Sequence, residues 1–209
     1  MIDVKLLSIT ANAEKLIEEC GRTAYLSFNM KNSDSTARFI RMLIKSGHLS
    51  VFEHASASFR IKGGSRAFTH QLVRHRMASF TQQSQRYVNE NNFSFVIPQS
   101  IENNNEAKKL FISHLEDTKY LYNQLLSIGI KKEDARFVLP NAIESEIVIT
   151  ANFREWRHIL FIRGEKQAQW EIRKIAIDIL KILKLKVPNC FYDMKIEDNI
   201  IIIDKTGKY

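Results

Sequence analysis

The pattern of apolar and polar positions along the chain predicts an α+β fold. From Ala55 to Lys62 every second residue is apolar or small, which is typical of a strand with one buried face. The longest amphipathic pattern runs from Glu106 to Ile128 and predicts a helix that ends at Gly129. A second long helix is predicted from Glu165 to Lys184. Its apolar face consists of Ile172, Ile175, Ile179 and Leu183.

Shorter elements are predicted before the strand from Ala55 to Lys62. Residues 2–9 form a strand, and Asn12 caps a short helix that Gly21 ends. A further helix runs from Ser35 to Ser46. After the Ala55 strand, Gly63-Gly64 is expected to turn the chain.

Downstream of that turn, Ser65 is expected to cap a helix that continues to about Arg76. A strand is expected from Glu146 to Thr150. Asn152 with Glu155 three residues later resembles a capping box, and it opens a helix that runs to Arg163. A small hairpin or arm is expected in the last ~20 residues. The sequence contains no repeat and no obvious linker. Residues 1–209 are therefore predicted to form one α+β domain with a small, mainly antiparallel sheet and long helices.

Composition narrows the class of protein only moderately. The net charge of +8 favours an anionic partner, such as a nucleotide, a nucleic acid or a membrane surface. The two cysteines, Cys20 and Cys190, make no metal-binding pattern and suit a reducing compartment. No signal peptide and no stretch of about 18 apolar residues is present, so a cytoplasmic protein is expected.

The stretch from Gln71 to Tyr87 is the most polar segment in the middle of the chain. Arg74, His75 and Arg76 are consecutive, so on a helix their side chains point about 100° apart and cannot hold one ligand atom. They could hold different parts of one large ligand or ligands from two subunits, or they could be a solvated basic helix end. The eight residues from Ser79 to Arg86 weaken the second interpretation, because they remain polar while carrying little charge.

Other candidates stand alone in the sequence. His48 follows Gly47 in a predicted loop, where it is either functional or simply exposed. Arg136 and Arg163 have apolar neighbours, which indicates either an internal salt bridge or a bound phosphate or acidic base. Arg154 and His158 are four residues apart near a helix start, a favourable place for a phosphate.

Taken together, these residues resemble a known family. Arg74-His75-Arg76, then seven residues, then Ser84 is similar to the signature of the flavin-dependent thymidylate synthases. Further matching segments follow the order of that family from about residue 47 to 171. They are Gly47-His48, Phe52–His54, Gln85–Tyr87, Ala135–Pro140, Asn152 with Arg154, and Arg163 with Ala168–Glu171.

The resemblance implies an FAD enzyme that methylates dUMP to dTMP. It implies methylenetetrahydrofolate as carbon donor, NADPH as reductant, tetrahydrofolate as product and a homotetramer whose active sites are built from several subunits. No cysteine nucleophile is implied, and both cysteines lie outside the matching segments. No metal is implied.

The same resemblance implies roles for individual residues. The catalytic candidates are Arg163, beside the uracil, and His48. The FAD-binding candidates are Ser50, Arg74, His75, Arg76, Gln82, Asn152, Arg154 and His158. The dUMP-binding candidates are Gln71, Arg74, Gln82, Gln83, Ser84, Gln85, Arg86, Arg136 and Arg163.

The chain departs from the family where Thr81-Gln82 replaces the Asn-Glu of many members, which removes one carboxylate. Ser84 has no paired base in the sequence, so binding rather than nucleophilic attack is expected of it. The competing hypotheses are a basic nucleic-acid-binding module without catalysis, which uses the Arg/Gln stretch, and a flavoprotein with other redox chemistry.

Overall fold

The sheet is built on β2 (Ser56–Ser65) and β4 (Glu144–Asn152), which are neighbours in it. Buried and half-buried residues alternate along the whole of β4, as the period of a strand requires. The order is β1 (Asp3–Ile9), β2, β4 and β3 (Ser79–Gln82), and the predicted small antiparallel sheet is confirmed.

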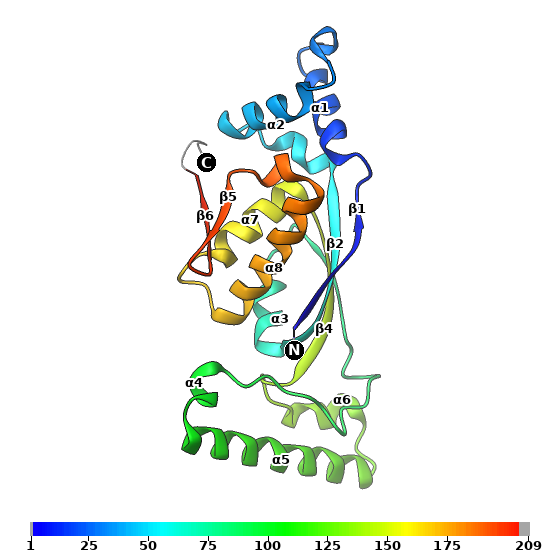
Figure 1. Ribbon diagram of the computed structural model, residues 1–209. Helices are drawn as coiled ribbons and strands as arrows, with labels where there is room; N and C mark the ends of the chain where they lie inside the picture. Colours follow the sequence, from blue (N-terminus) through cyan, green and yellow to red (C-terminus); the bar gives the residue numbers. More distant parts are fainter. Residues whose placement is uncertain (1, 205–209) are drawn as a thin grey trace. The chain divides into compact units, whose positions relative to one another are not determined.

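The computed structural model describes residues 2–204 (Figure 1). It divides into two compact units. The first unit comprises residues 2–3, 61–72 and 81–147, and the second comprises residues 4–60, 73–80 and 148–204. Within residues 2–204, no helix has both the length and the apolar character needed to cross a membrane.

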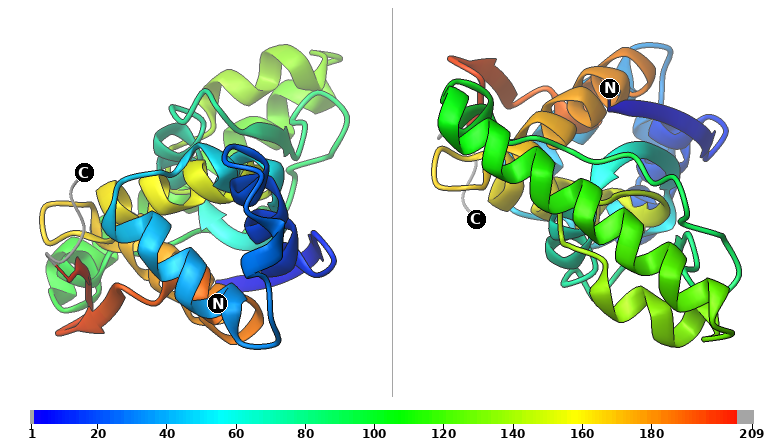
Figure 2. Two further views of the ribbon diagram at one scale, coloured as in Figure 1. Left: turned by 90° about the horizontal axis from the view of Figure 1, so that it is seen from above. Right: turned by 90° about the horizontal axis from the view of Figure 1, so that it is seen from below.

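The first unit is dominated by α5 (Asn105–Ser127), which Figure 2 shows along its full length. Asn104 caps it by accepting from the backbone N–H groups of Glu106 and Ala107. The shorter helices are α3 (Arg66–Leu72), α4 (Gln99–Glu102), α6 (Lys132–Ala135) and the 3-10 turn η3 (Arg136–Val138). Phe93, Leu115 and Ile143 form the buried centre of this unit.

In the second unit, α7 (Phe153–Gly164) packs against α8 (Trp170–Lys186), and both lie side by side in Figure 1. The predicted inward residues of α8 are buried, and Trp156 of α7 is fully buried. The hairpin of β5 (Met194–Glu197) and β6 (Ile200–Ile203) is antiparallel, so the predicted hairpin is present. The remaining elements are α1 (Ala13–Thr23), η1 (Phe28–Met30), α2 (Ser35–Lys45), η2 (Ser50–His54) and η4 (Pro188–Phe191).

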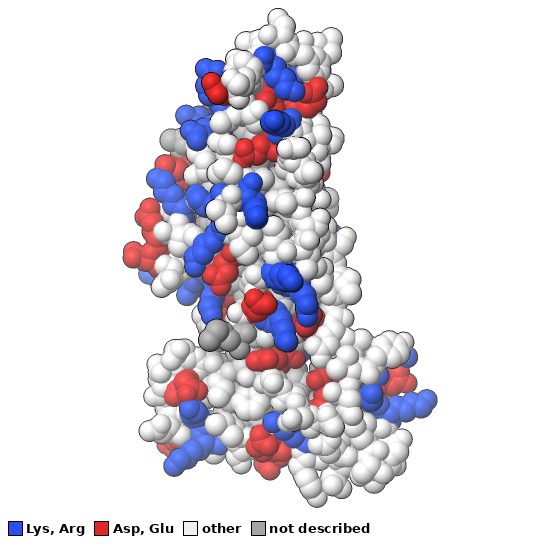
Figure 3. Space-filling model, turned by 45° about the vertical axis from the view of Figure 1, so that its right-hand side comes forward, with Lys and Arg blue, Asp and Glu red and all other residues white. Residues whose placement is uncertain are grey.

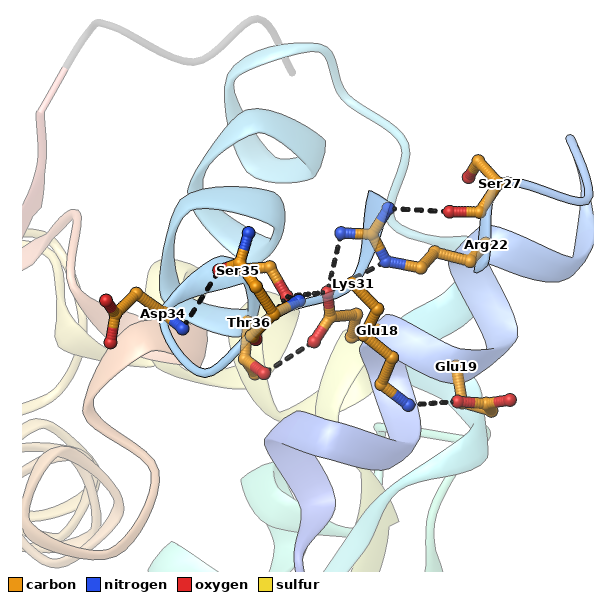
Figure 4. Close-up of polar contacts among 9 residues, drawn as sticks. Glu18, Glu19, Arg22, Ser27, Lys31, Asp34, Ser35 and Thr36 are labelled. Atoms are coloured by element: carbon orange, nitrogen blue, oxygen red, sulfur yellow. Dashed lines mark hydrogen bonds and ion pairs between the residues drawn. The ribbon is translucent and has the colours of Figure 1, made fainter. Parts of the chain in front are cut away.

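A buried polar cluster joins α1 to α2 (Figure 4). Glu18 is fully buried and accepts from Ser35 Oγ at 2.6 Å, Thr36 Oγ1 at 2.5 Å and Arg22 Nε at 2.8 Å. Burial by itself raises the pKa of Glu18, but these donors outweigh it and hold the pKa below its ordinary value. Arg22 also donates to the carbonyl of Ser27. The cluster therefore fixes the helix pair from which the His48 loop leaves.

The last turn of α7 is closed by β6. A Cβ on Gly164 would lie 2.5 Å from side-chain atoms of Ile201, so only glycine permits this approach. The contact places the C-terminal hairpin directly against the turn that carries Arg163.

Several predicted features differ from the structure. Gly63 and Gly64 continue β2 instead of turning the chain, because Gly63 keeps the buried alternation of Ala57, Phe59 and Ile61. Gly21 does not end α1, which runs to Thr23. Its missing side chain makes room for Phe39, whose ring would lie 2.6 Å from a Cβ.

Two further differences concern the ends of helices. The helix predicted to reach Arg76 ends at Leu72, so Arg74, His75 and Arg76 lie on the turn that follows α3 and not on a helix. Asn12 precedes α1 as predicted, but its backbone is left-handed and its side chain makes no capping bond.

Candidate functional site

The start of α7 presents a polar face in the second unit. Asn152 caps the helix by accepting from the backbone N–H of Glu155 at 2.8 Å, as the capping-box pattern predicted. Arg154 and His158 are both exposed on this face. They line the same cavities, which confirms that their four-residue spacing brings them together.

His75 is the centre of the polar contacts behind this face. Arg163 Nε donates to His75 Nε2 over 2.9 Å, and the rings of His75 and His158 meet edge to face with centroids 5.9 Å apart. His75 Nδ1 lies 3.5 Å from Glu155 Oε1. The chain turn after α3 therefore delivers one buried imidazole to three residues of α7, all in the second unit.

The pKa shifts follow from this packing. Burial, then the charges of Arg163 and His158, lower the pKa of His75 to about 4, so the imidazole is neutral at pH 7. Burial raises the pKa of Glu155 above its ordinary value, and His158 opposes that rise. Burial also lowers the pKa of Arg163, and the nearby charge of Arg74 lowers it further.

Two cavities open along α7. One, of about 420 Å³, is lined by Glu53, Met77, Asn152, Arg154, Glu155 and His158. The other, of about 540 Å³, is lined by Gly47, Leu49, Arg154, Arg157, His158, Phe161 and Ile162. The two share Arg154 and His158. Their walls combine apolar surface with cationic and hydrogen-bonding groups, which suits a flat heteroaromatic ligand that carries phosphates.

The remaining candidates of the second unit lie in its loops. His48 and Ser50 are exposed, and Gly47 and Leu49, the neighbours of His48, line the larger cavity. Arg74 and Arg76 are exposed on the turn after α3. Arg74 is close enough to Arg163 for its charge to act there, whereas Arg76 is not among the residues that line the two α7 cavities.

The first unit holds most of the predicted dUMP residues. Gln83 Nε2 donates to Glu90 Oε1 over 2.9 Å, while Gln82 Nε2 donates to Thr69 Oγ1 and Ser145 Oγ. Gln82 is thus engaged inside this unit, where the carboxylate of an Asn-Glu pair would stand. The other predicted dUMP residues of this unit are Gln71, Ser84, Gln85, Arg86 and Arg136.

Arg86 and Arg136 both make contacts near α6. Arg86 Nε lies 2.9 Å from Glu133 Oε2, and Ser84 Oγ accepts from the backbone N–H of Arg86 at 3.3 Å. Arg136 Nε donates to the carbonyl of Glu133 at 3.1 Å. Within residues 2–204, the side chain of Arg136 is therefore bonded to a backbone carbonyl and not to the carboxylate of an internal salt bridge.

The sequence did not single out Arg66, Glu53 or Glu155. Burial lowers the pKa of Arg66, and Arg136 lowers it further while Glu90 raises it, so two guanidinium groups lie close enough to repel in the first unit. Glu53 Oε1 lies 2.5 Å from Arg154 Nη1. Glu53 belongs to the Phe52–His54 segment, one of those that carry the resemblance. Glu155 was explained in the sequence by the capping-box pattern alone, so no further role was assigned to it.

Charged side chains on the face drawn in Figure 3 are of both signs and interspersed. A nucleic-acid-binding surface would be expected to gather lysine and arginine on one face. Among residues 2–204, no group of three or more His, Cys, Asp or Glu side chains is placed to hold a metal ion.

Comparisons with known proteins agree on one family. The family model described as thymidylate synthase complementing protein matches residues 5–189. The flavin-dependent thymidylate synthase of Corynebacterium efficiens is 40% identical over 202 residues, covering 88% of this chain and 81% of the relative. That of Geobacter sulfurreducens is 41% identical over 199 residues, covering 91% and 85%.

A solved structure is similar as well. The crystal structure of a UMP/dUMP methylase from Streptomyces cacaoi, bound with 5-bromo-dUMP, superposes with a TM-score of 0.81 at 25% identity, covering 92% of this chain and 93% of that one. The resemblance carried by Arg74-His75-Arg76 and the later segments is confirmed. The chain belongs to the flavin-dependent thymidylate synthase family.

Proposed function

We propose that this protein methylates dUMP to dTMP with FAD as its bound cofactor, methylenetetrahydrofolate as carbon donor and NADPH as reductant. The observation that carries the proposal is the contact of Arg163 with His75. The His75 ring in turn contacts His158, and His158 lines both α7 cavities. A neutral, buried imidazole thus holds a guanidinium beside a ligand-sized opening. Family membership supports the reaction class.

The residues around these cavities fit FAD chemically. Arg154 supplies a fork of donors for the diphosphate, and Asn152 marks a helix start that favours negative charge. Leu49, Phe161 and Ile162 offer apolar surface to a flat ring system. We assign FAD binding to Ser50, Arg74, His75, Arg76, Asn152, Arg154 and His158. When bound and reduced, FAD supplies the hydride that completes the methyl group.

Arg163 is proposed to act on the pyrimidine. Methylation at C5 requires negative charge to build up on the uracil ring, and loss of the N3 proton creates that charge. A guanidinium held by His75 can stabilise it without reorganising, because its position is set before the substrate arrives. Arg74, whose charge reaches Arg163, adds to the positive potential. His48, on its exposed loop, is proposed to act near the reacting atoms.

Binding of dUMP is assigned mainly to the first unit, through Gln71, Gln82, Gln83, Ser84, Gln85, Arg86 and Arg136. Arg66 joins this set, because the charge of Arg136 acts on its guanidinium and a bound phosphate would reduce the repulsion between these two cations. The Gln82 bonds to Thr69 and Ser145 favour a supporting role for that side chain over FAD binding. A homotetramer with active sites built from several subunits, a single domain over residues 1–209 and a cytoplasmic location complete the proposal.

An absorbance spectrum separates this function from the nucleic-acid-binding hypothesis. The purified protein, or the protein after addition of FAD, should show the bands of oxidised flavin. Tritium release from 5-tritiated dUMP that depends on NADPH and methylenetetrahydrofolate should then separate it from other flavin chemistry. A protein that takes up no FAD and binds DNA tightly would overturn the proposal.

A further inference from the structure

The imidazole of His75 lies between Arg163 and the carboxylate of Glu155. One ring nitrogen, Nε2, accepts from Arg163 Nε over 2.9 Å, and the other, Nδ1, lies 3.5 Å from Glu155 Oε1. His75 is 6% exposed and Glu155 is 9% exposed. Bulk water therefore competes little for either group, and the interactions between them are strong.

The hydrogen bond with Arg163 identifies the tautomer that His75 adopts in this structure. A guanidinium has donors and no acceptor, so the nitrogen that faces Arg163 must present a lone pair. In a neutral ring the proton is then on Nδ1, on the side of Glu155. The opposite tautomer would set a ring N–H against an arginine N–H and turn a lone pair toward a carboxylate. Burial and the charges of Arg163 and His158 lower the pKa of His75 to about 4, which keeps the ring neutral.

We propose that Glu155 is a positioning residue, which selects the Nδ1-protonated tautomer of His75 and so keeps Nε2 free to hold the guanidinium of Arg163. A separation of 3.5 Å is long for a hydrogen bond, so the carboxylate acts mainly through its charge. The kinetic consequence rests on the proposed role of Arg163 at the uracil. The tautomer assignment does not, because it follows from the three side chains alone.

The other charged or titratable groups near this ring do not provide the same bias. His158 meets the ring edge to face at 5.9 Å between centroids, and Arg74 acts on Arg163 from the turn after α3. Neither Arg74 nor Arg163 has an acceptor for a ring N–H, and His158 contacts the His75 ring through an edge-to-face arrangement without a hydrogen bond between them. Among the described groups in contact with His75, Glu155 is the one anion on the Nδ1 side.

The tautomer can be measured without turnover. In protein labelled with ¹⁵N-histidine, long-range ¹H–¹⁵N spectra distinguish the two tautomers, and His75→Asn identifies the signals. Wild type is expected to show the Nδ1-protonated form alone. Glu155→Gln keeps the shape but can donate as well as accept, so the Nε2-protonated form should become populated. Glu197→Gln, which neutralises an exposed glutamate of β5, should leave the spectrum unchanged.

Kinetics provide the second readout. Misplacing a catalytic group by a small distance can cost up to about a hundredfold in rate, so kcat for thymidylate formation should fall by about tenfold or more in Glu155→Gln. Glu155→Asp, which restores an acceptor-only group, should recover most of it, with melting temperatures of all variants close to wild type. If His75 keeps the same tautomer in both Glu155→Gln and Glu155→Ala, the proposal is wrong. Absence of thymidylate formation by wild type would instead refute the proposed function, and the spectra would still decide this inference.

Discussion

Arg154 Nη1 lies 2.5 Å from Glu53 Oε1, and both residues line the smaller cavity beside α7. The arginine proposed to hold the FAD diphosphate is therefore already paired with a carboxylate. Both side chains are about half exposed, so the pair itself stabilises the fold little. A phosphate that binds Arg154 must compete with Glu53.

Glu53→Gln is accordingly expected to strengthen FAD binding. An exposed pair is worth up to about 1 kcal/mol, which corresponds to about a fivefold decrease in Kd. Arg154→Ala should weaken binding by more than that, because it removes the donors themselves. Titration of the apoprotein with FAD, followed by flavin fluorescence, measures both, with Glu197→Gln as the control for net charge. Weaker binding by Glu53→Gln would show that Glu53 itself contacts the cofactor.

Arg163→Ala is expected to reduce kcat by about a hundredfold or more, the usual effect of removing a donor aimed at developing charge. Arg163→Lys keeps the charge but loses the paired donors, so it should recover only part of the rate. Arg38→Ala, which removes an exposed arginine of α2, is the matched control. Thymidylate formation under saturating substrates tests this. A near-normal kcat in Arg163→Ala would contradict the assigned role.

Ser84→Ala should weaken dUMP binding yet leave measurable turnover. Ser84 Oγ accepts from the backbone of Arg86, so the hydroxyl shapes the segment expected to meet the nucleotide. Loss of one such hydrogen bond costs about 1 kcal/mol, or about fivefold in Kd. Isothermal titration with dUMP measures the Kd, and steady-state kinetics measure the remaining turnover. Complete inactivity with intact dUMP binding would instead make Ser84 a nucleophile.

The lowered pKa of His75 predicts that acid destabilises the apoprotein. The folded state holds this ring neutral down to pH about 4, whereas the unfolded chain takes up a proton near pH 6.5. The stabilising contribution is therefore complete above pH 6.5 and is lost as the pH falls toward 4, which amounts to about 3 kcal/mol. In His75→Asn this part of the decline should be missing when melting temperatures are compared at pH 7 and pH 4.5. Identical pH dependence in both proteins would contradict it.

Glu18→Ala should destabilise the fold by about 3–5 kcal/mol, because Arg22 would be left buried without its partner. The pKa of Glu18 is below its ordinary value in the folded state, so the contribution of this carboxylate is present above pH 4.5 and disappears at lower pH. Denaturant unfolding at pH 7 measures the loss. Glu19→Ala, one position away and exposed, is the control.

The long elements were predictable because their own sequences determine them. The helices α5 and α8 carry apolar faces that recur over many turns, and β4 alternates without interruption. The end of α3 was not predictable from local pattern. Nothing after Leu72 breaks a helix, yet the chain turns there and His75 reaches Arg163, a residue 88 positions further along.

The candidate site divides in the same way. The spacing of Arg154 and His158 was sufficient to place both on one helix face. The position of Glu155 beside His75 depends on two distant segments meeting, and in sequence this glutamate is explained fully by a capping pattern. The pairing of Glu53 with Arg154 joins residues 101 positions apart and left no local signal.

The contact between Gly164 and Ile201 implies an order of events during synthesis of the chain. The turn of α7 that carries Arg163 is packed by β6, which leaves the ribosome only after α8 and β5 have been made. Until Ile201 has emerged, the turn that carries Arg163 lacks its contact with β6. The helix that lines both α7 cavities is thus completed late in synthesis, so the geometry that we propose for FAD binding arises only when almost the whole described chain is available.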